Sequence, residues 1–430
     1  MGVTITLRSA RSGFALWIAL ALAGLGATCR AQSTAAVTAV LARAVERGDA
    51  PGVVGLVVDR DRVLFQGAAG VLDVAHDTPL GTDAIFNIAS MTKPVTSVAV
   101  MMLLEQGKLA LDDPVSRYLP GFDHLRVITH FNPVDGTCET RPAKRTMTLR
   151  HLLTHTSGIG YAFSSPIVAR LQQGNDKAEW ELPLLHDPGE RWTYSPSTRV
   201  LGLIVEKISG ESLEAFFQEH IFVPLGMLDT SFAVPVAKQQ RVITLYSHSD
   251  GAFQQQPGRI VPSSPTAPFH GDGGLYSTAG DYGRFLRMLL NGGRLGETRI
   301  LSAKSVALMS RNQIGAVFVS QQPAANPERT RPFPLGAGRD KFGLGFQISA
   351  PGHGGIADEG TGDEGRGHRS PGSLSWAGIY NTEFWIDPQR GLGAVLLMQY
   401  LPFYDDAAMR TLREFEGAVY GRLAPPPPRR

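Results

Sequence analysis

The sequence predicts an α+β fold, in which an antiparallel sheet is flanked by helices and receives an inserted all-helical lobe. Short apolar segments separated by turn residues lie near both ends of the chain, at about 45–89 and 341–423. Segments with helical periodicity fill the middle, at about 108–330. This order fits one sheet built from both ends of the chain, and it argues against regular βαβ winding and against tandem domains.

The first elements are expected to be a hairpin and a helix. Residues 53–68 contain two β-branched runs around a polar turn, which is typical of a β-hairpin. From Ser90 to residue 106 the pattern becomes helical, and Gly107 is suited to end that helix.

The middle of the chain is expected to be helical and punctuated by glycine. Helical segments are predicted at 146–158, at 277–293 and, as two consecutive helices, at 198–226. Each of them ends at a glycine. Thr278 and Asp281 have the spacing of a capping box.

Strands return after about residue 341. The segments "FGLGFQIS", "SLSWAGIY", "TEFWIDP" and "LGAVLLMQY" are short, apolar and separated by Gly, Pro and Asn. A closing helix is predicted at 405–423, and the proline-rich residues 424–430 are expected to form a disordered tail. Residues 351–372 are too rich in glycine for a regular element, so we expect a mobile insertion there.

The first 31 residues are predicted to be a secretory signal peptide. Arg8 and Arg11 precede an apolar stretch of about a dozen residues, and Ala31 stands at a suitable cleavage site. This predicts a periplasmic or secreted protein, with a retained membrane anchor as the alternative. Cleavage would leave Cys138 as the remaining cysteine, so no intramolecular disulfide is expected.

The overall charge and the candidate metal ligands narrow the function further. The formal net charge is +2, so the chain lacks the basic field of a nucleic-acid-binding protein. His151 and His155 have the spacing of a zincin helix, but Leu152 stands where its glutamate would be. We therefore expect no metal and no cofactor.

Ser90 and Lys93 are the first candidate catalytic residues. Positions i and i+3 lie on one face of a helix, so the two polar tips are neighbours. A serine hydroxyl needs a nearby base to act as a nucleophile, and a lysine with a lowered pKa can serve. The S-x-x-K pattern alone is weak, and a surface Ser–Lys pair is the alternative.

Two further segments could complete a site. Tyr194 stands before a predicted helix. Beside a lysine its phenolate form is favoured, and it could then relay the serine proton. The alternative is a tyrosine of the hydrophobic core. On a predicted strand, Ala377 and Gly378 would let a substrate approach closely. The backbone N–H groups of Ile379 and Ser90 could together donate hydrogen bonds to an oxyanion. The alternative interpretation is that Gly378 is simply a glycine in an edge strand.

Taken together, these segments resemble the serine β-lactamase and penicillin-binding-protein superfamily, and within it the family VIII esterases related to class C β-lactamases. The resemblance runs from about 45 to 420 and is strongest in "SMTKPVTSVAVMMLLEQGKLALDDPVSRYLPGF", "LLTHTSGIGYAF", "YSPSTRVLGLIVEKISG" and "GGLYSTAGDYGRFLRMLLNGG". It implies a β-lactamase-like serine hydrolase domain over residues 32–423.

The resemblance also implies roles for the residues. Ser90 would be the acylated nucleophile, Lys93 would take its proton or hold the proton network, and Tyr194 would pass a proton to the leaving group. Trp376, Ala377 and Gly378 would form the third motif beside the site. We do not choose between Lys93 and Tyr194 as the base, because two coupled groups titrate as a pair.

Two departures from the wider superfamily bear on the substrate. Trp376 stands where β-lactamases and peptidases have the lysine of Lys-Thr-Gly, which removes a charge-assisted contact to a substrate carboxylate. Pro196 stands where β-lactamases have the asparagine of Tyr-x-Asn.

His353-Gly354-Gly355 is a second-ranked alternative for the third motif. Tyr161, Phe163, Trp192 and Trp385 could line an acyl pocket, although core positions explain each of them more simply.

The sequence thus predicts a serine hydrolase that cleaves small-molecule acyl esters through a covalent acyl-enzyme on Ser90. Within the enzymes, the alternative is a β-lactamase or a D-alanyl-D-alanine carboxypeptidase. The alternative from another class is a protein of this fold that binds cell-wall peptide without turnover. Membrane association is expected only if the N-terminal segment is retained.

Overall fold

The computed structural model describes residues 34–425 apart from residues 175, 257–259 and 352–367. The predicted signal peptide, most of the predicted glycine-rich insertion with His353, and residues 426–430 therefore lie outside the described residues. Described residues 34–46 form a helix that precedes the first strand.

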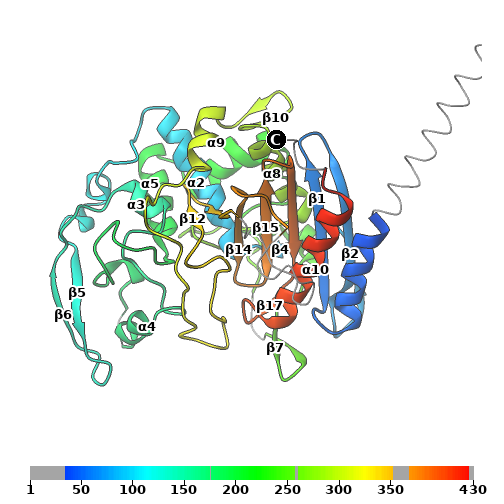
Figure 1. Cartoon of the computed structure of the whole chain (residues 1–430), viewed down its shortest axis with the longest axis horizontal. Coiled ribbons are helices and arrows are strands. Elements are labelled where there is room, and N and C mark those ends of the chain that lie inside the picture. The colour runs from blue at the N-terminus through cyan, green and yellow to red at the C-terminus, as the bar shows by residue number, and fades with distance from the viewer. Residues whose placement is uncertain (1–33, 175, 257–259, 352–367, 426–430) are drawn as a thin grey trace, which may run out of the picture.

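A central antiparallel sheet is the core of the fold (Figure 1). It has eight strands in the order β12-β13-β14-β15-β16-β1-β2-β3. Their bounds are β1 (Gly52–Asp59), β2 (Val63–Asp73), β3 (Thr78–Pro79), β12 (Lys341–Phe342), β13 (Gln347–Ile348), β14 (Leu374–Gly378), β15 (Thr382–Asp387) and β16 (Leu392–Leu397). Because β16 pairs with β1, the two ends of the chain build one sheet, which confirms the predicted fold class.

The helices and short turns lie mostly between the two groups of strands. The α-helices are α2 (Thr92–Glu105), α3 (Leu149–Leu153), α4 (Pro166–Gln172), α5 (Ser197–Ser209), α6 (Leu213–Phe217), α7 (Val223–Leu225), α8 (Ala279–Leu290), α9 (Ala303–Met309) and α10 (Asp406–Arg422). The 3₁₀ and π turns are η1 (Ala89–Met91), η2 (Val115–Arg117), η3 (Pro120–Phe122), η4 (Glu179–Glu181), η5 (Gln218–Phe222) and η6 (Val236–Arg241).

The predicted all-helical lobe is wrong in detail, because the inserted segment also contains short strands, two of which pair with strands outside it. The small sheets are β4 (Phe86–Asn87) with β9 (Tyr276–Ser277), β5 (Arg126–Phe131) with β6 (Cys138–Pro142), β7 (Tyr246–Ser249) with β8 (Ala252–Gln255) and β17 (Tyr400–Leu401), and β10 (Arg294–Leu295) with β11 (Thr298–Arg299); of these strands, β4 and β17 lie outside the inserted segment. Figure 1 shows the β5–β6 hairpin projecting at the side opposite β1 and β2. These ribbons are short, and their sequences lack the long β-branched runs by which strands are recognised.

Both faces of the sheet are covered, which explains the nearly continuous apolar runs of its central strands. In β1, Val54, Leu56 and Val58 belong to one core with α2, α5 and α8, while Val53 and Val57 belong to a second core with α10. Alternate residues of a strand point to opposite faces, so a strand between two cores needs apolar residues at every position.

The helix predicted at 146–158 is shorter than expected, and this changes the place of His155. The helix α3 begins after Thr148, whose side chain caps it, and ends at Leu153. His155 follows with a positive φ of 55°, so the chain turns there instead of continuing as a helix to Gly158. His155 therefore lies beyond the helix and does not share a helical face with His151, and its ring is buried.

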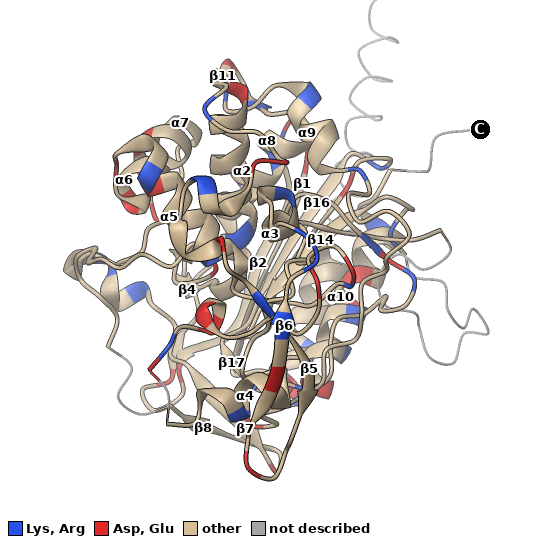
Figure 2. Ribbon diagram, turned by 90° about the vertical axis from the view of Figure 1, so that its left-hand side faces the viewer, with Lys and Arg blue, Asp and Glu red and all other residues tan. Residues whose placement is uncertain are grey.

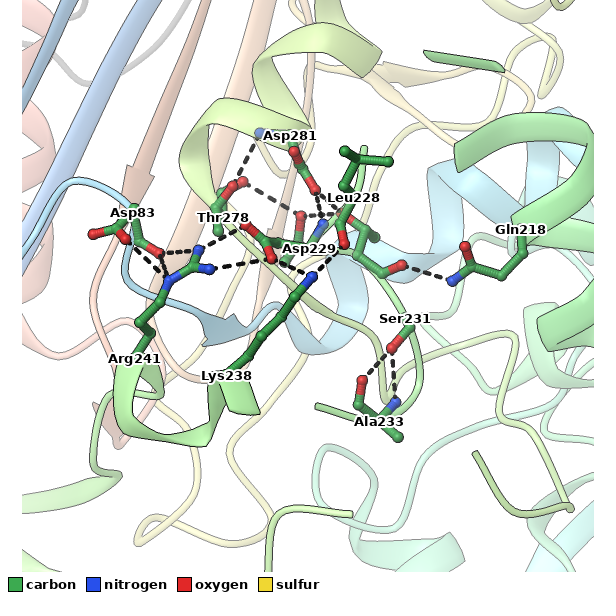
Figure 3. Close-up of polar contacts among 12 residues, drawn as sticks. Asp83, Gln218, Leu228, Asp229, Ser231, Ala233, Lys238, Arg241, Thr278 and Asp281 are labelled. Atoms are coloured by element: carbon green, nitrogen blue, oxygen red, sulfur yellow. Dashed lines mark hydrogen bonds and ion pairs between the residues drawn. The ribbon is translucent and has the colours of Figure 1, made fainter. Parts of the chain in front are cut away.

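The predicted capping box at α8 forms only in part. The Thr278 side chain accepts a hydrogen bond from Asp281 N–H, as expected. The Asp281 carboxylate instead accepts from the backbone N–H of Asp229, at 2.7 Å. Asp229 in turn pairs with Lys238 and Arg241, and Arg241 reaches Asp83 in the segment that leads to β4 (Figure 3). This network ties α8 to the chain just before Ser90.

Charges of both signs are spread over the described residues (Figure 2). Figure 2 shows Lys and Arg interspersed with Asp and Glu over the ribbon. Within the described ranges, the helices are too short or too polar to cross a bilayer.

We predict that Gly283→Ala destabilises the protein by about 1–3 kcal/mol, the usual cost of overpacking. Gly283 lies on the buried side of α8, and an added Cβ would collide with Leu56 Cδ2 of β1. Gly280→Ala is the matched control, because its Cβ would meet nothing closer than 3.8 Å. That change should be neutral or stabilising, since alanine favours helix. Urea unfolding of both variants checks this, and equal stabilisation by both would contradict the packing of α8.

Candidate active site

Ser90 lies in a tight turn at the start of the buried helix α2. The turn η1 precedes α2 directly, and Ala89 has a positive φ of 45°, which is uncommon for a residue with a Cβ. Ala89 N–H donates to Asn87 Oδ1 at 3.0 Å, which fixes the turn. The chain thus changes direction sharply at Ser90, and the serine side chain lines a cleft.

The Lys93 amine is buried against Ser90. Lys93 is 1% exposed, and its Nζ lies 3.1 Å from Ser90 Oγ. The same nitrogen lies 3.1 Å from the Tyr161 hydroxyl and 2.7 Å from the backbone oxygen of Asp272. The predicted Ser–Lys neighbourhood is therefore present in the structure, and it faces the protein interior instead of solvent.

Burial lowers the pKa of Lys93 to about 7. The Asp272 carboxylate opposes this shift, and the nearby Arg199 guanidinium adds to it. A lysine with this pKa is partly neutral at physiological pH, so its amine can accept a proton.

Tyr194 reaches the same serine from the segment before α5. Its hydroxyl donates to Ser90 Oγ at 2.7 Å, and its ring lies beneath the Lys93 amine, 4.8 Å from Nζ to the ring centre. Burial raises the pKa of Tyr194 above its ordinary value. The expectation of a favoured phenolate is therefore wrong, because loss of water around the phenol outweighs the interactions with Ser90 and Trp376 that favour its ionised form.

Tyr161, Asp272 and Arg199 form a charged support behind Lys93. Tyr161 donates to Asp272 Oδ2 at 2.5 Å, and Arg199 Nε donates to Asp272 Oδ1 at 2.8 Å. Sequence reasoning did not identify Asp272 or Arg199 and assigned Tyr161 only to core or pocket. No local pattern could have found this contact, because Tyr161 and Asp272 are 111 residues apart.

The third predicted segment forms the edge of the site. Trp376, Ala377 and Ile379 line the cleft together with Ser90 and Tyr194. Gly378 packs so tightly on Ile88, just before η1, that an added Cβ would collide with the Ile88 carbonyl oxygen. The structure thus brings all the predicted site residues together, while the oxyanion role of the Ile379 N–H stays a prediction.

One wall of the cleft is aromatic. That wall includes Phe163, Phe333, Trp376, Phe403 and Tyr404.

Of the four aromatic pocket candidates, Phe163 alone is among the residues that line the cleft. Tyr161 contacts Lys93 instead, and Trp192 is buried beside His155. Trp385 packs on Phe415 of α10, within the second core.

His155 supports the site from the core without titrating near neutral pH. Its ring lies 5.0 Å from that of Tyr194, and its Nδ1 is 3.1 Å from Ser195 Oγ. Burial, together with the Lys93 charge, lowers the pKa of His155 well below its usual range. Among the described residues, one group has metal-ligand spacing, Glu211 with Glu219 and His220, and none of the three lines the cleft.

Comparisons with known proteins agree with the fold described above. A model of the β-lactamase family matches residues 37–418. Protein Rv1367c of Mycobacterium tuberculosis is 35% identical, covering 82% of this chain and 86% of that protein. Monacolin J acid methylbutanoyltransferase of Aspergillus terreus is 30% identical, and the match covers 80% of this chain and 84% of that protein. Esterase EstB of Burkholderia gladioli is 28% identical, and the match covers 85% of this chain and 90% of that protein. The unliganded structure of simvastatin synthase (LovD) from Aspergillus terreus has a TM-score of 0.74 at 26% identity, covering 91% of this chain and 98% of that one.

We predict that the Lys93 amine titrates with a midpoint near pH 7, about three units below an ordinary lysine. Asp272→Asn should lower this midpoint further, because it removes the carboxylate that stabilises the ammonium form of Lys93. The positive charge of Arg199, which destabilises that form, would then be uncompensated. ¹³C NMR of protein labelled at the lysine ε-carbons measures the midpoint, and Lys93→Arg identifies the signal.

Asp281→Asn is the control for this titration. It removes another buried carboxylate, which belongs to the α8 network, and it should leave the Lys93 midpoint unchanged. A midpoint near 10 in the native protein, or an upward shift in Asp272→Asn, would contradict the described burial of the amine.

Proposed function

This chain belongs to the β-lactamase family, which includes acyltransferases and esterases, and on that premise we propose that it cleaves acyl esters through a covalent acyl-enzyme on Ser90. One observation carries the proposal: Ser90 Oγ lies between the Lys93 amine and the Tyr194 hydroxyl, at the surface of a cleft.

The first step is attack of Ser90 Oγ on the ester carbonyl carbon. The neutral Lys93 amine accepts the serine proton as the new C–O bond forms, since its pKa of about 7 matches this task at neutral pH. The N–H groups of Ser90 and Ile379 are proposed to stabilise the negative charge that develops on the carbonyl oxygen. Among the two candidate bases, the opposite pKa directions favour Lys93 over Tyr194.

The second step is loss of the alcohol, and here Tyr194 has the suitable chemistry. Its phenol keeps its proton and already donates to Ser90 Oγ, so it can give that proton to the departing alkoxide as the C–O bond breaks. The Lys93 ammonium, which lies against the Tyr194 ring, then returns the proton. A water molecule that attacks the acyl-enzyme by the reverse path releases the acid and restores Ser90.

A second candidate function is transfer of the acyl group to an alcohol instead of water. The relative that is 30% identical is a methylbutanoyltransferase, and the aromatic wall of the cleft suits an organic acceptor. Both functions share the acyl-enzyme and differ only in what accepts the acyl group.

The cleft favours neutral esters over β-lactams and peptides with a free carboxylate. Arg369 is the one lysine or arginine among the described residues that line it, and its guanidinium is bound to Glu416 at 2.9 Å. Trp376 occupies the motif position of the usual carboxylate-binding lysine.

Binding of cell-wall peptide without turnover is less favoured, because a binding protein has no need of a buried base beside the serine. The periplasmic or secreted location also remains a proposal, based on residues 1–31.

We predict that Ser90→Ala abolishes hydrolysis of a chromogenic short-chain ester and labelling by a fluorophosphonate. Ser157→Ala is the matched control, because Ser157 is a buried serine that bonds Ser197 and lies outside the cleft lining. The control should keep the label. A chromogenic cephalosporin and a D-Ala-D-Ala peptide, offered side by side, test the alternatives. Substantial ester turnover by Ser90→Ala would refute the assignment.

We predict that Tyr194→Phe lowers kcat on the order of 10²-fold, as is usual when a proton-transfer group is lost. The ring and its packing remain, so the loss should be smaller for esters of acidic phenols, whose leaving groups need no proton. Steady-state kinetics with an alkyl and a nitrophenyl ester of the same acid measure this difference. Unchanged kinetics with both esters would remove Tyr194 from the mechanism.

A further inference from the structure

The cleft that begins at Ser90 ends in a buried polar region on the other side of strand β14. Trp376 and Ala377 are successive residues of β14, so their side chains leave it on opposite faces, and both line the cleft. Beyond Ala377 the lining changes from aromatic to polar, with Asp340, Gln347, Ser349, Arg369, Ser375 and Glu383. We call this region the polar end of the cleft.

Glu383 is the most unusual residue of the polar end. It lies on β15 directly opposite Ala377 and is 8% exposed. Within the described part of the chain, no group donates a hydrogen bond to its carboxyl. Burial raises the pKa of Glu383 to about 8, with Glu416 adding to the shift and Arg369 opposing it. The group therefore keeps its proton at pH 7 and has an O–H to donate.

The charged neighbours of Glu383 already have partners. Arg369 donates from Nε and Nη2 to Glu416, at 3.1 and 2.9 Å. Asp340 accepts from Gln347 Nε2 at 2.6 Å and from Ala350 N–H at 3.0 Å. Arg369 and Glu416 balance each other, and the Asp340 carboxylate accepts from neutral donors, so the polar end offers no free cation to an anionic ligand.

Two hydroxyl groups complete the polar end. Ser349 is 5% exposed, and Ser375 lies next to Gln347 in the β13–β14 ladder. A protonated carboxyl and serine hydroxyls can both donate and accept hydrogen bonds, as an alcohol does. A buried carboxyl without a partner is costly, and a bound hydroxyl would relieve that cost.

We propose that Glu383 and Ser375, which is two residues from Ala377 on the same face of β14, bind a hydroxyl group on the acyl chain of the substrate, so that the preferred substrates are hydroxyacyl esters. The proposal rests on the ester-cleaving function proposed above. The acyl part is assigned to the polar end because this end is nearly closed, with Asp340 and Ser349 at 3% and 5% exposure. A closed end suits the group that stays bound through both steps, whereas the leaving alcohol has to escape.

The test compares nitrophenyl esters of ω-hydroxyalkanoic acids of six and eight carbons with the plain alkanoates of equal length. For the native protein, kcat/KM should be higher for at least one hydroxyl ester than for its alkanoate, by roughly tenfold, the value of one good hydrogen bond. In Glu383→Leu this ratio should fall below one, because the hydroxyl would then be buried without a partner.

Two further variants separate recognition from general damage. Glu383→Gln keeps a neutral hydrogen-bonding group and should retain most of the preference. Glu214→Gln is the matched control, since Glu214 is equally buried at 8% exposure but lies on α6, outside the cleft lining. Its ratio should equal that of the native protein. If Glu383→Leu does not fold, Ser375→Ala replaces it, with a smaller drop of the ratio expected.

Binding to Ser90→Ala protein, measured by calorimetry with the same esters, keeps the two proposals distinguishable. If the native protein cleaves alkanoates without preferring either hydroxyl ester, or if the ratio is unchanged in Glu383→Leu, this inference is wrong and the proposed function stands. If the native protein cleaves none of the esters, the proposed function fails. Equal binding of hydroxyl and plain esters by Ser90→Ala would then overturn the hydroxyl site as well.

Discussion

The burial of one amine is the constraint on which the rest of the site depends. Lys93 is removed from water and surrounded by Tyr161, Tyr194 and the Asp272 backbone, which makes its charged form costly. That cost brings its pKa close to physiological pH, where a lysine can take up a proton from a neighbouring hydroxyl. Asp272 moderates the shift, because a carboxylate near the amine restores part of the lost stabilisation of the ammonium.

The fold supplies this environment by joining segments that are distant in sequence. Helix α2 brings Ser90 and Lys93, the segment before α5 brings Tyr194, and the strand β14 closes the other side. Gly378 is decisive at this junction, since only a residue without a side chain lets β14 contact the turn that holds Ser90. Within the sheet, β14 is paired with β13 on one side and with β15 on the other.

Local sequence patterns were sufficient for the sheet and for the Ser90–Lys93 pair, because both depend on regular periodicity and spacing. Tyr194 and the Trp376 segment needed a family resemblance, since their positions relative to Ser90 are set by tertiary packing. Asp272 and Arg199 gave no signal, because an ion pair between residues 73 positions apart has no local sequence pattern. The early end of α3 was missed because His155 adopts a left-handed conformation that no local rule assigns to histidine. The phenolate expectation failed because burial of the Tyr194 phenol, which only the folded protein reveals, raises its pKa.

The account depends most directly on whether Ser90 becomes acylated during turnover. Rapid acid quenching of the native protein with excess ester, followed by mass spectrometry of its peptides, measures this. We predict a mass increase equal to the acyl group on the peptide that contains Ser90, appearing within the first turnover and disappearing when substrate is exhausted. Steady cleavage of the ester with no adduct, or with the adduct on another residue, would contradict the account.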